Sequence, residues 1–177
     1  GVLCGGASPD LDAMLTGSDA LLAVGTDFDA VTTGHWRLDL PETLIHVTYD
    51  ADDIGTGYAP SVALVADAKR TLAALADGLP VGGADGEERA TAVREADAAR
   101  IEALRTGREP LTSVEALRAV RAALPRDTVV SVDAGGFRIW TLVAFPAYGP
   151  DRYVNPGSWA TMGTGLPAAI GAAAATP

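Results

Sequence analysis

Residues 132–140 read VDAGGFRIW, and this stretch decides how the sequence around it folds. An apolar run over 127–132 predicts a buried strand, and residues 137–145 predict the helix that follows it. Glycines between them let the backbone approach a bound group, and the first N–H groups of the helix favour an anion such as a diphosphate. A plain strand-to-helix turn gives the same pattern. The G-x-G-x-x-G dinucleotide fingerprint is absent, because only Gly135 and Gly136 stand together.

A second stretch, residues 158–177, reads SWATMGTGLPAAIGAAAATP. It predicts a Gly/Ala-rich helix over 163–175, with Pro167 in the first turn, where proline is tolerated. Side chains this small let another element pack closely against the helix. By composition alone the stretch is more typical of a core helix or a subunit contact, and Met162 of an ordinary gap-filling residue.

Upstream, helix and strand patterns alternate. Ser8 and Pro9 predict an N-cap and first helical position, with the helix ending near residue 17. Apolar runs over 20–24, 43–49 and 61–66 predict strands, the first of them buried on both faces, and a helix follows the third. Continuous apolar runs separated by crossovers indicate a parallel sheet, and we expect the first two strands to be neighbours.

The middle of the chain changes character. Residues 87–108 are highly charged with sparse apolar positions, which predicts a solvated helix. Thr112 is then predicted to cap a helix, and residues 153–154 are predicted to form a short strand. The predicted fold class is therefore α/β, with two incomplete, doubly wound (Rossmann-like) parallel-sheet units. We expect domains at 1–80 and 111–177, joined by a helical linker over 81–110.

Composition excludes several functions. The 177 residues carry a formal net charge of −10, and this acidity argues against a nucleic-acid partner and an anionic membrane surface. No apolar run approaches the length of a membrane span, and the first residues do not show the charged-then-apolar pattern of a leader. The one cysteine, Cys4, forms no intrachain disulfide and fits a reducing, cytoplasmic compartment. Two histidines, His35 and His46, are too few for a His-rich metal site. Because the chain opens on Gly1 rather than Met, we expect both ends to be cut.

Taken in this order, the two glycine-rich stretches resemble the pyrophosphate-binding domain of thiamine-diphosphate enzymes, nearest the acetolactate synthase and pyruvate oxidase branch. The family's Asp-x-Gly turn and its following aromatic residue match Asp133, Gly135 and Trp140. Its M-G-x-G-L-P-A-A-I-G-A segment matches residues 162–172. The stretches LLAVGTDFD, TLIHVTYDADDIG and SVALVADAKRTLAAL resemble the second half of the family's central domain. The resemblance spans nearly the whole chain except the charged linker.

The resemblance implies roles for particular residues. Met162 falls on the bulky residue that holds the cofactor in its V shape, which makes it the candidate catalytic residue. The backbone carbonyl of Ala160 would accept a hydrogen bond from the cofactor's 4′-amino group. The positions that line the diphosphate are Gly135, Gly136 and Phe137. Thr161 and Gly163, which flank the wedge residue, complete the expected cofactor-binding set.

Departures from the family pattern limit what is implied. Close relatives carry Gln and His where Gly136 and Phe137 stand, so only backbone donors remain. Flavin-binding relatives carry arginines in the stretch of Asp27 and Val31 and an acidic residue at Thr48, which argues against bound FAD. The Mg²⁺ ligands would lie beyond this sequence and the activating Glu before it. Asp133 is no convincing metal ligand, and a lone carboxylate at a turn is more often a cap.

The family resemblance implies part of a 2-oxo acid decarboxylase or carboligase that works as a homodimer or homotetramer. Two alternatives remain open. One is a nucleotide-binding module, for which Asp50 is the only acidic residue available at a strand end. The other is a non-catalytic structural homologue whose Gly/Ala helix is a dimer contact.

Overall fold

The computed structural model describes residues 8–80, 86–107 and 109–176. Its contacts divide the chain into two compact units, residues 1–97 and 98–177. Both are built on parallel strands with helices between them, so the predicted α/β class is confirmed. Among the described residues, no helix is both long and apolar enough to cross a membrane.

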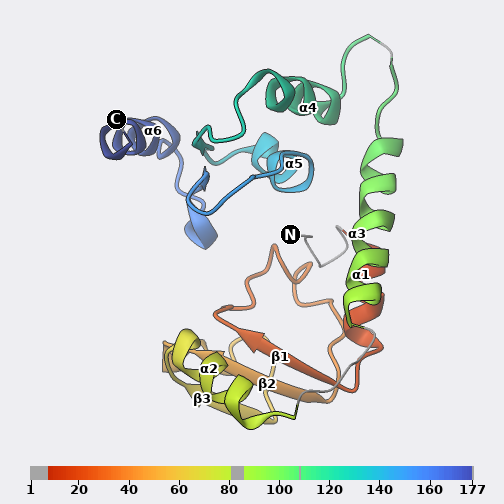
Figure 1. Cartoon of the computed structure of the whole chain (residues 1–177), viewed down its shortest axis with the longest axis vertical. Helices are drawn as coiled ribbons and strands as arrows, with labels where there is room; N and C mark the ends of the chain where they lie inside the picture. Colours follow the sequence, from red (N-terminus) through yellow and green to blue (C-terminus); the bar gives the residue numbers. More distant parts are fainter. Residues whose placement is uncertain (1–7, 81–85, 108, 177) are drawn as a thin grey trace. The chain divides into compact units, whose positions relative to one another are not determined.

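The first unit holds a three-stranded parallel sheet in the order β1-β2-β3 (Figure 1). Leu22 pairs with Ile45, and Ile45 pairs with Val62, so the predicted neighbouring strands are confirmed. The predicted cap is confirmed as well, since the Ser8 hydroxyl accepts from the N–H of Leu11 at 3.4 Å. The elements are α1 (Pro9–Thr16), β1 (Ala20–Val24), β2 (Thr43–Thr48), η1 (Ala51–Asp53), β3 (Val62–Val65) and α2 (Ala68–Gly78).

The core of this unit lies along the central strand β2. Leu44, His46 and Val47 are buried, and the ring of Phe28 packs edge-on against His46 with centroids 5.0 Å apart. The His46 Nε2 atom lies 2.9 Å from the carbonyl oxygen of Thr26, which fastens the loop after β1 to the sheet. Among the described residues, His46 belongs to no cluster of three or more potential metal-ligating side chains.

The expectation that β1 is buried on both faces is wrong. Its Leu22 is 41% exposed, and every residue of β3 is exposed. Both strands lie at edges of the sheet; Ala23 of β1 is still buried, whereas the described residues leave β3 uncovered. The apolar runs identified parallel strands correctly but overstated their burial.

The charged stretch forms the predicted helix, α3 (Gly86–Ala103). Of the proposed linker, residues 81–85 and 108 lie outside the described part of the chain. The boundary between the compact units falls within α3, after Asp97.

The second unit holds two parallel strands, with Val130 paired to Tyr153 and Ser131 to Val154. Its core cluster joins Ile101, Val114 and Ala144. The elements are α4 (Ser113–Ala123), β4 (Val130–Ser131), α5 (Gly136–Ala144), β5 (Tyr153–Val154), η2 (Gly157–Trp159) and α6 (Gly165–Ala175).

Two boundaries in this unit differ from prediction. The strand expected over 127–132 is only β4, because the short β5 offers two residues for pairing. The helix expected from residue 163 begins at Gly165, because Gly163 has a φ of +83° and cannot continue a right-handed helix. Thr112 caps α4 as predicted, in a reciprocal capping box with Glu115.

Candidate functional site

Asp133 lies directly after β4 and joins the two glycine-rich stretches. Its Oδ1 atom accepts from the N–H of Ala134 at 2.7 Å and from the N–H of Gly163 at 2.9 Å. Its Oδ2 atom accepts from the N–H of Gly165 at 3.0 Å. Asp133 is therefore a cap, as a lone carboxylate at a turn predicts. It caps the start of α6 as well as its own turn.

The contact between Asp133 and Gly165 is so close that a side chain at position 165 would force its neighbour to shift. A Cβ atom added to Gly165 would lie 3.0 Å from the Asp133 Cβ and 3.1 Å from its Oδ2. The N–H of Gly165 lowers the pKa of Asp133 most, desolvation opposes it, and the N–H groups of Ala134, Gly163 and Thr164 lower it further. The carboxylate therefore stays ionised at neutral pH and accepts from both segments.

The turn that starts α5 presents backbone donors. Gly135 is its N-cap, with a φ of +143° and no side-chain cap, so the first N–H groups of α5 are not capped by a side chain. A Cβ at Gly136 would meet nothing within 4 Å, and the Phe137 side chain is 51% exposed. This arrangement suits an anion held by main-chain N–H groups.

The segment before α6 carries the other predicted residues. Ala160 has left-handed backbone angles, φ 48° and ψ 39°, which residues other than glycine rarely adopt. The carbonyl oxygen of Thr161 accepts from the Thr164 hydroxyl at 3.0 Å. Met162 is 84% exposed, so it is no core residue of the described chain.

The structure thus brings two groups of predicted residues to one place. Through Asp133, the turn of Gly135 and Gly136 is tied to the turn that holds Gly163. A second link runs from the Arg138 guanidinium, which donates to the carbonyl of Gly157 at 2.9 Å. Sequence reasoning identified Asp133 as a cap but not its distant partners. The G-x-G spacing of residues 163–165 was the available signal, since it provides N–H groups that a carboxylate can approach closely.

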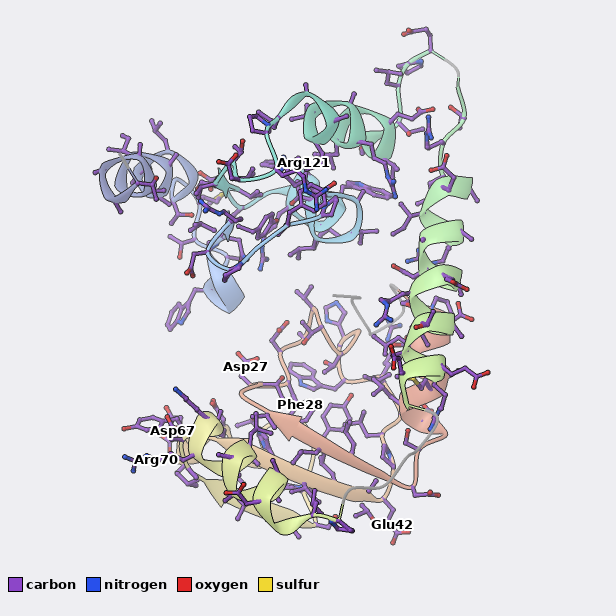
Figure 2. All side chains as sticks on the ribbon, in the orientation of Figure 1. Asp27, Phe28, Glu42, Asp67, Arg70 and Arg121 are labelled. Atoms are coloured by element: carbon purple, nitrogen blue, oxygen red, sulfur yellow. The ribbon has the colours of Figure 1, made fainter. Side chains whose placement is uncertain are left out.

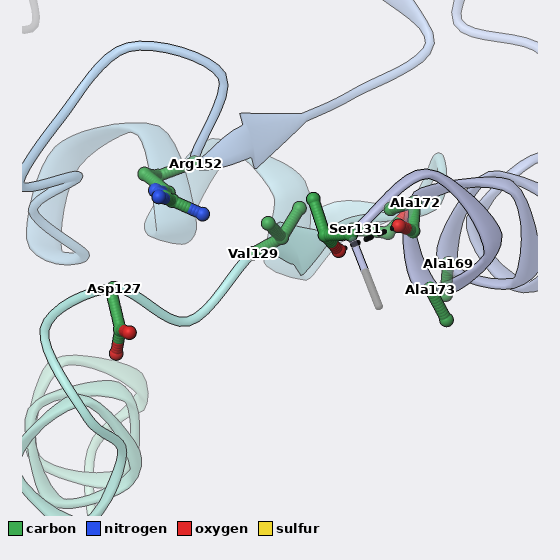
Figure 3. Close-up of a pocket in the computed structure, with 8 residues that line it drawn as sticks. Asp127, Val129, Ser131, Arg152, Ala169, Ala172 and Ala173 are labelled. Atoms are coloured by element: carbon green, nitrogen blue, oxygen red, sulfur yellow. Dashed lines mark hydrogen bonds between the residues drawn. The ribbon is translucent and has the colours of Figure 1, made fainter.

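A cavity of about 540 Å³ lies beside β4 and α6 (Figure 3). Val129 and Ser131 line it from the strand side, and Ala169, Ala172 and Ala173 line it from the helix. No residue of the predicted cofactor-binding set is among its lining residues. The cavity and the Asp133 turn are therefore separate features of the second unit.

The first unit offers no comparable site at the expected positions. Asp27 is exposed in the loop after β1, next to the buried Phe28 (Figure 2), and Val31 is 46% exposed. The buried Thr48 donates to Asp53 at 3.2 Å. The Asp50 carboxylate, which the nucleotide-binding alternative required, accepts from the N–H of Asp52 at 2.9 Å and caps η1. Within the described ranges, no three metal-ligating side chains gather.

These features define a class: an α/β protein whose second unit presents an uncapped helix N-terminus and a glycine-rich turn at the carboxyl end of a parallel strand. The comparisons with known proteins are specific. Residues 1–75 match the thiamine pyrophosphate enzyme central domain, and residues 133–177 match that family's C-terminal TPP binding domain. The chain belongs to the thiamine pyrophosphate enzyme family.

Several relatives support the same assignment. A probable 2-ketoarginine decarboxylase of Pseudomonas aeruginosa is 36% identical over 93% of the chain. The acetolactate synthase isozyme 1 large subunit of Escherichia coli is 32% identical over 93%. A probable acetolactate synthase large subunit of Methanocaldococcus jannaschii is 29% identical over 92%. The chain spans only about 29% of the length of each of these relatives.

Proposed function

We propose that this chain is part of a thiamine-diphosphate-dependent 2-oxo acid decarboxylase or carboligase of the acetolactate synthase type. The observation that supports this most is the Asp133 contact, which joins the β4 turn to the Met162 turn. The family resemblance requires those two segments to meet around one cofactor.

The residues present fit that cofactor. The uncapped N–H groups at Gly135, Gly136 and Phe137 would hold the diphosphate, because a helix N-terminus favours an anion. The left-handed Ala160 would turn its carbonyl toward the 4′-amino group, with Thr161 and Gly163 flanking. Met162 would support the bent cofactor, and its exposure leaves it available for that contact. When bound, thiamine diphosphate supplies the nucleophilic carbon that attacks a 2-oxo group.

The metal, the oligomeric state and the substrate are proposed for the whole protein. Mg²⁺ would bridge the diphosphate through ligands outside these residues. Large apolar side chains on and before α6 are exposed, namely Trp159 at 92%, Leu166 at 72% and Ile170 at 62%. Such a surface supports a homodimer or homotetramer. We propose a cytoplasmic enzyme that acts on a small 2-oxo acid and has no nucleic-acid or membrane partner.

Calorimetry on the full-length protein tests this function. Thiamine diphosphate should bind only with Mg²⁺ present, and thiamine, which lacks the diphosphate, should bind far more weakly. A panel of 2-oxo acids, including pyruvate and 2-ketoarginine, should then reveal carbon dioxide release with at least one member. Thiamine diphosphate binding without turnover of any member would favour the non-catalytic homologue. Absence of cofactor binding would refute the proposal.

Flavin provides an independent check. Asp27 and Val31 stand where flavin-binding relatives carry arginines, and a carboxylate would repel a flavin diphosphate. The purified full-length protein should therefore be colourless. A yellow protein with the absorption of bound flavin would contradict this part of the proposal.

A further inference from the structure

Met162 lacks the packing that would hold an ordinary core methionine in place. Its side chain is 84% exposed, and Trp159 nearby in the chain is 92% exposed. Its position must therefore follow from the backbone that carries it. That backbone is fixed immediately after Met162, where the N–H of Gly163 donates to Asp133.

The Asp133 carboxylate holds this backbone at two points. One oxygen takes the Gly163 N–H at 2.9 Å and the other takes the Gly165 N–H at 3.0 Å, so the two bonds fix both position and orientation of the turn. The first oxygen also takes the N–H of Ala134, which ties the turn to the end of β4. An amide in place of the carboxylate would lose this arrangement, because its NH₂ group cannot accept from an N–H.

We propose that Asp133 is a positioning residue of the cofactor site, and that its carboxylate sets the place of Met162 by clamping Gly163 and Gly165 to the β4 turn. The inference rests on the proposed function, because it concerns the same site. We assign Asp133 no contact with cofactor or substrate. It acts through the main chain of the turn.

The test uses the full-length protein with Asp133→Asn and, as a matched control, Asp127→Asn, which removes an exposed carboxylate from the same unit. The first readout is amide hydrogen exchange of the apo-protein over residues 160–166. Exchange there should rise by at least about tenfold in Asp133→Asn and stay unchanged in Asp127→Asn, because only the former replaces an oxygen that accepts from these amides with an NH₂ group.

The second readout separates cofactor use from substrate use. The ratio of kcat to the KM for thiamine diphosphate should fall by about tenfold to a hundredfold in Asp133→Asn, since a 1 Å misplacement costs on that order. The KM for the 2-oxo acid should hardly change. If Asp133 were merely structural, exchange would instead rise across α5 and α6 together and the melting temperature would fall. That result would overturn the proposal.

Gly165→Ala provides a second variant in case Asp133→Asn does not fold. It keeps the carboxylate, but its Cβ would meet Asp133 at 3.0 Å and push the start of α6 away. It should raise exchange over 160–166 and weaken cofactor use in the same sense. Wild-type exchange and cofactor kinetics in either folded variant would overturn the clamp while the proposed function stands. A wild-type protein that binds no thiamine diphosphate would overturn both.

Discussion

One carboxylate of the second unit, Asp133, differs from the capping carboxylates of the first. In the first unit, Asp29, Asp50 and Asp67 each accept from a backbone N–H two or three residues ahead, and so cap their own loops. In the second unit, Asp133 reaches across 30 residues to Gly163, while Gly135 starts α5 without a side-chain cap. Local caps satisfy a loop's own donors. The long-range clamp leaves the donors of α5 available for a ligand, which explains why the second unit carries the candidate site.

The units also differ in where their large apolar residues lie. Leu44 on β2 is 2% exposed, whereas Leu166 on α6 is 72% exposed. We expect Leu44→Ala to destabilise the first unit by about 2–5 kcal/mol, the usual cost of truncating a buried leucine. Leu166→Ala makes the same change and should cost less than about 0.5 kcal/mol in the 177-residue chain.

Hydrogen exchange under mild urea measures both variants, segment by segment. Protection over 43–48 should fall in Leu44→Ala and remain unchanged in Leu166→Ala. Equal losses of protection from the two substitutions would show that the contrast in burial does not decide stability, and the comparison between the units would fail.

A smaller effect should come from Arg121 (Figure 2), which is buried at the end of α4. Its guanidinium donates to the carbonyls of Leu124 and Pro125 and lies 5.0 Å from the Tyr148 ring centroid. Arg121→Met should cost about 1.5–3 kcal/mol, because hydrogen bonds to charged groups are worth that much.

Arg126→Met is the matched control for Arg121→Met. Arg126 lies 3.7 Å from the same Tyr148 ring but is exposed, so its loss should cost about 0.5–1 kcal/mol. Urea denaturation of the two variants, followed by exchange in α4, measures the difference. Equal urea midpoints for the two variants would mean that stacking on the Tyr148 ring, and not the carbonyl contacts, gives Arg121 its contribution to stability.

The sequence predicted the elements well where a local rule sets them. Ser8 and Thr112 cap their helices because a hydroxyl before an apolar pattern satisfies the nearest N–H groups. Sequence rules failed at boundaries set by tertiary structure. β4 is short because β5 offers only two residues for pairing, and α6 begins late because Gly163 adopts a positive φ. The family resemblance is confirmed, while the roles of the individual site residues stay predictions. The G-x-G spacing of residues 163–165 indicates N–H groups that a carboxylate can approach, but only the tertiary structure shows that Asp133 is that carboxylate.

A carboxylate in the second unit gives a pH-dependent prediction. Glu115 accepts from the N–H of Thr112, the largest cause, and from those of Gly107 and Thr106, which lowers its pKa from 4.5 to about 2. A lowered pKa in the folded state means that the contribution is complete above pH 4.5 and is lost as pH falls toward 2. Wild-type melting temperature should therefore drop through that window.

Glu115→Gln removes the titrating group and should show a smaller drop over the same window. It should also melt lower than wild type at pH 7, because the amide replaces one acceptor with a donor. Thermal scans at several pH values between 3 and 7 compare the two proteins. Parallel curves for wild type and variant would show that another group carries the acid sensitivity of this unit.

An effect on stability as small as that of Leu166→Ala should come from Met162→Ala. Truncating a buried methionine costs about 2–5 kcal/mol. Because Met162 is 84% exposed, we expect a change within about 0.5 kcal/mol. Exchange of the C2 proton of bound thiamine diphosphate should nevertheless slow on the order of a hundredfold in the full-length protein, because a cofactor without its support loses proximity between reacting atoms. Met162→Leu keeps the bulk and should restore most of the rate. Unchanged proton exchange together with a much lower melting temperature of the apo-protein would make Met162 a packing residue of the complete enzyme, and the second unit would then resemble the first.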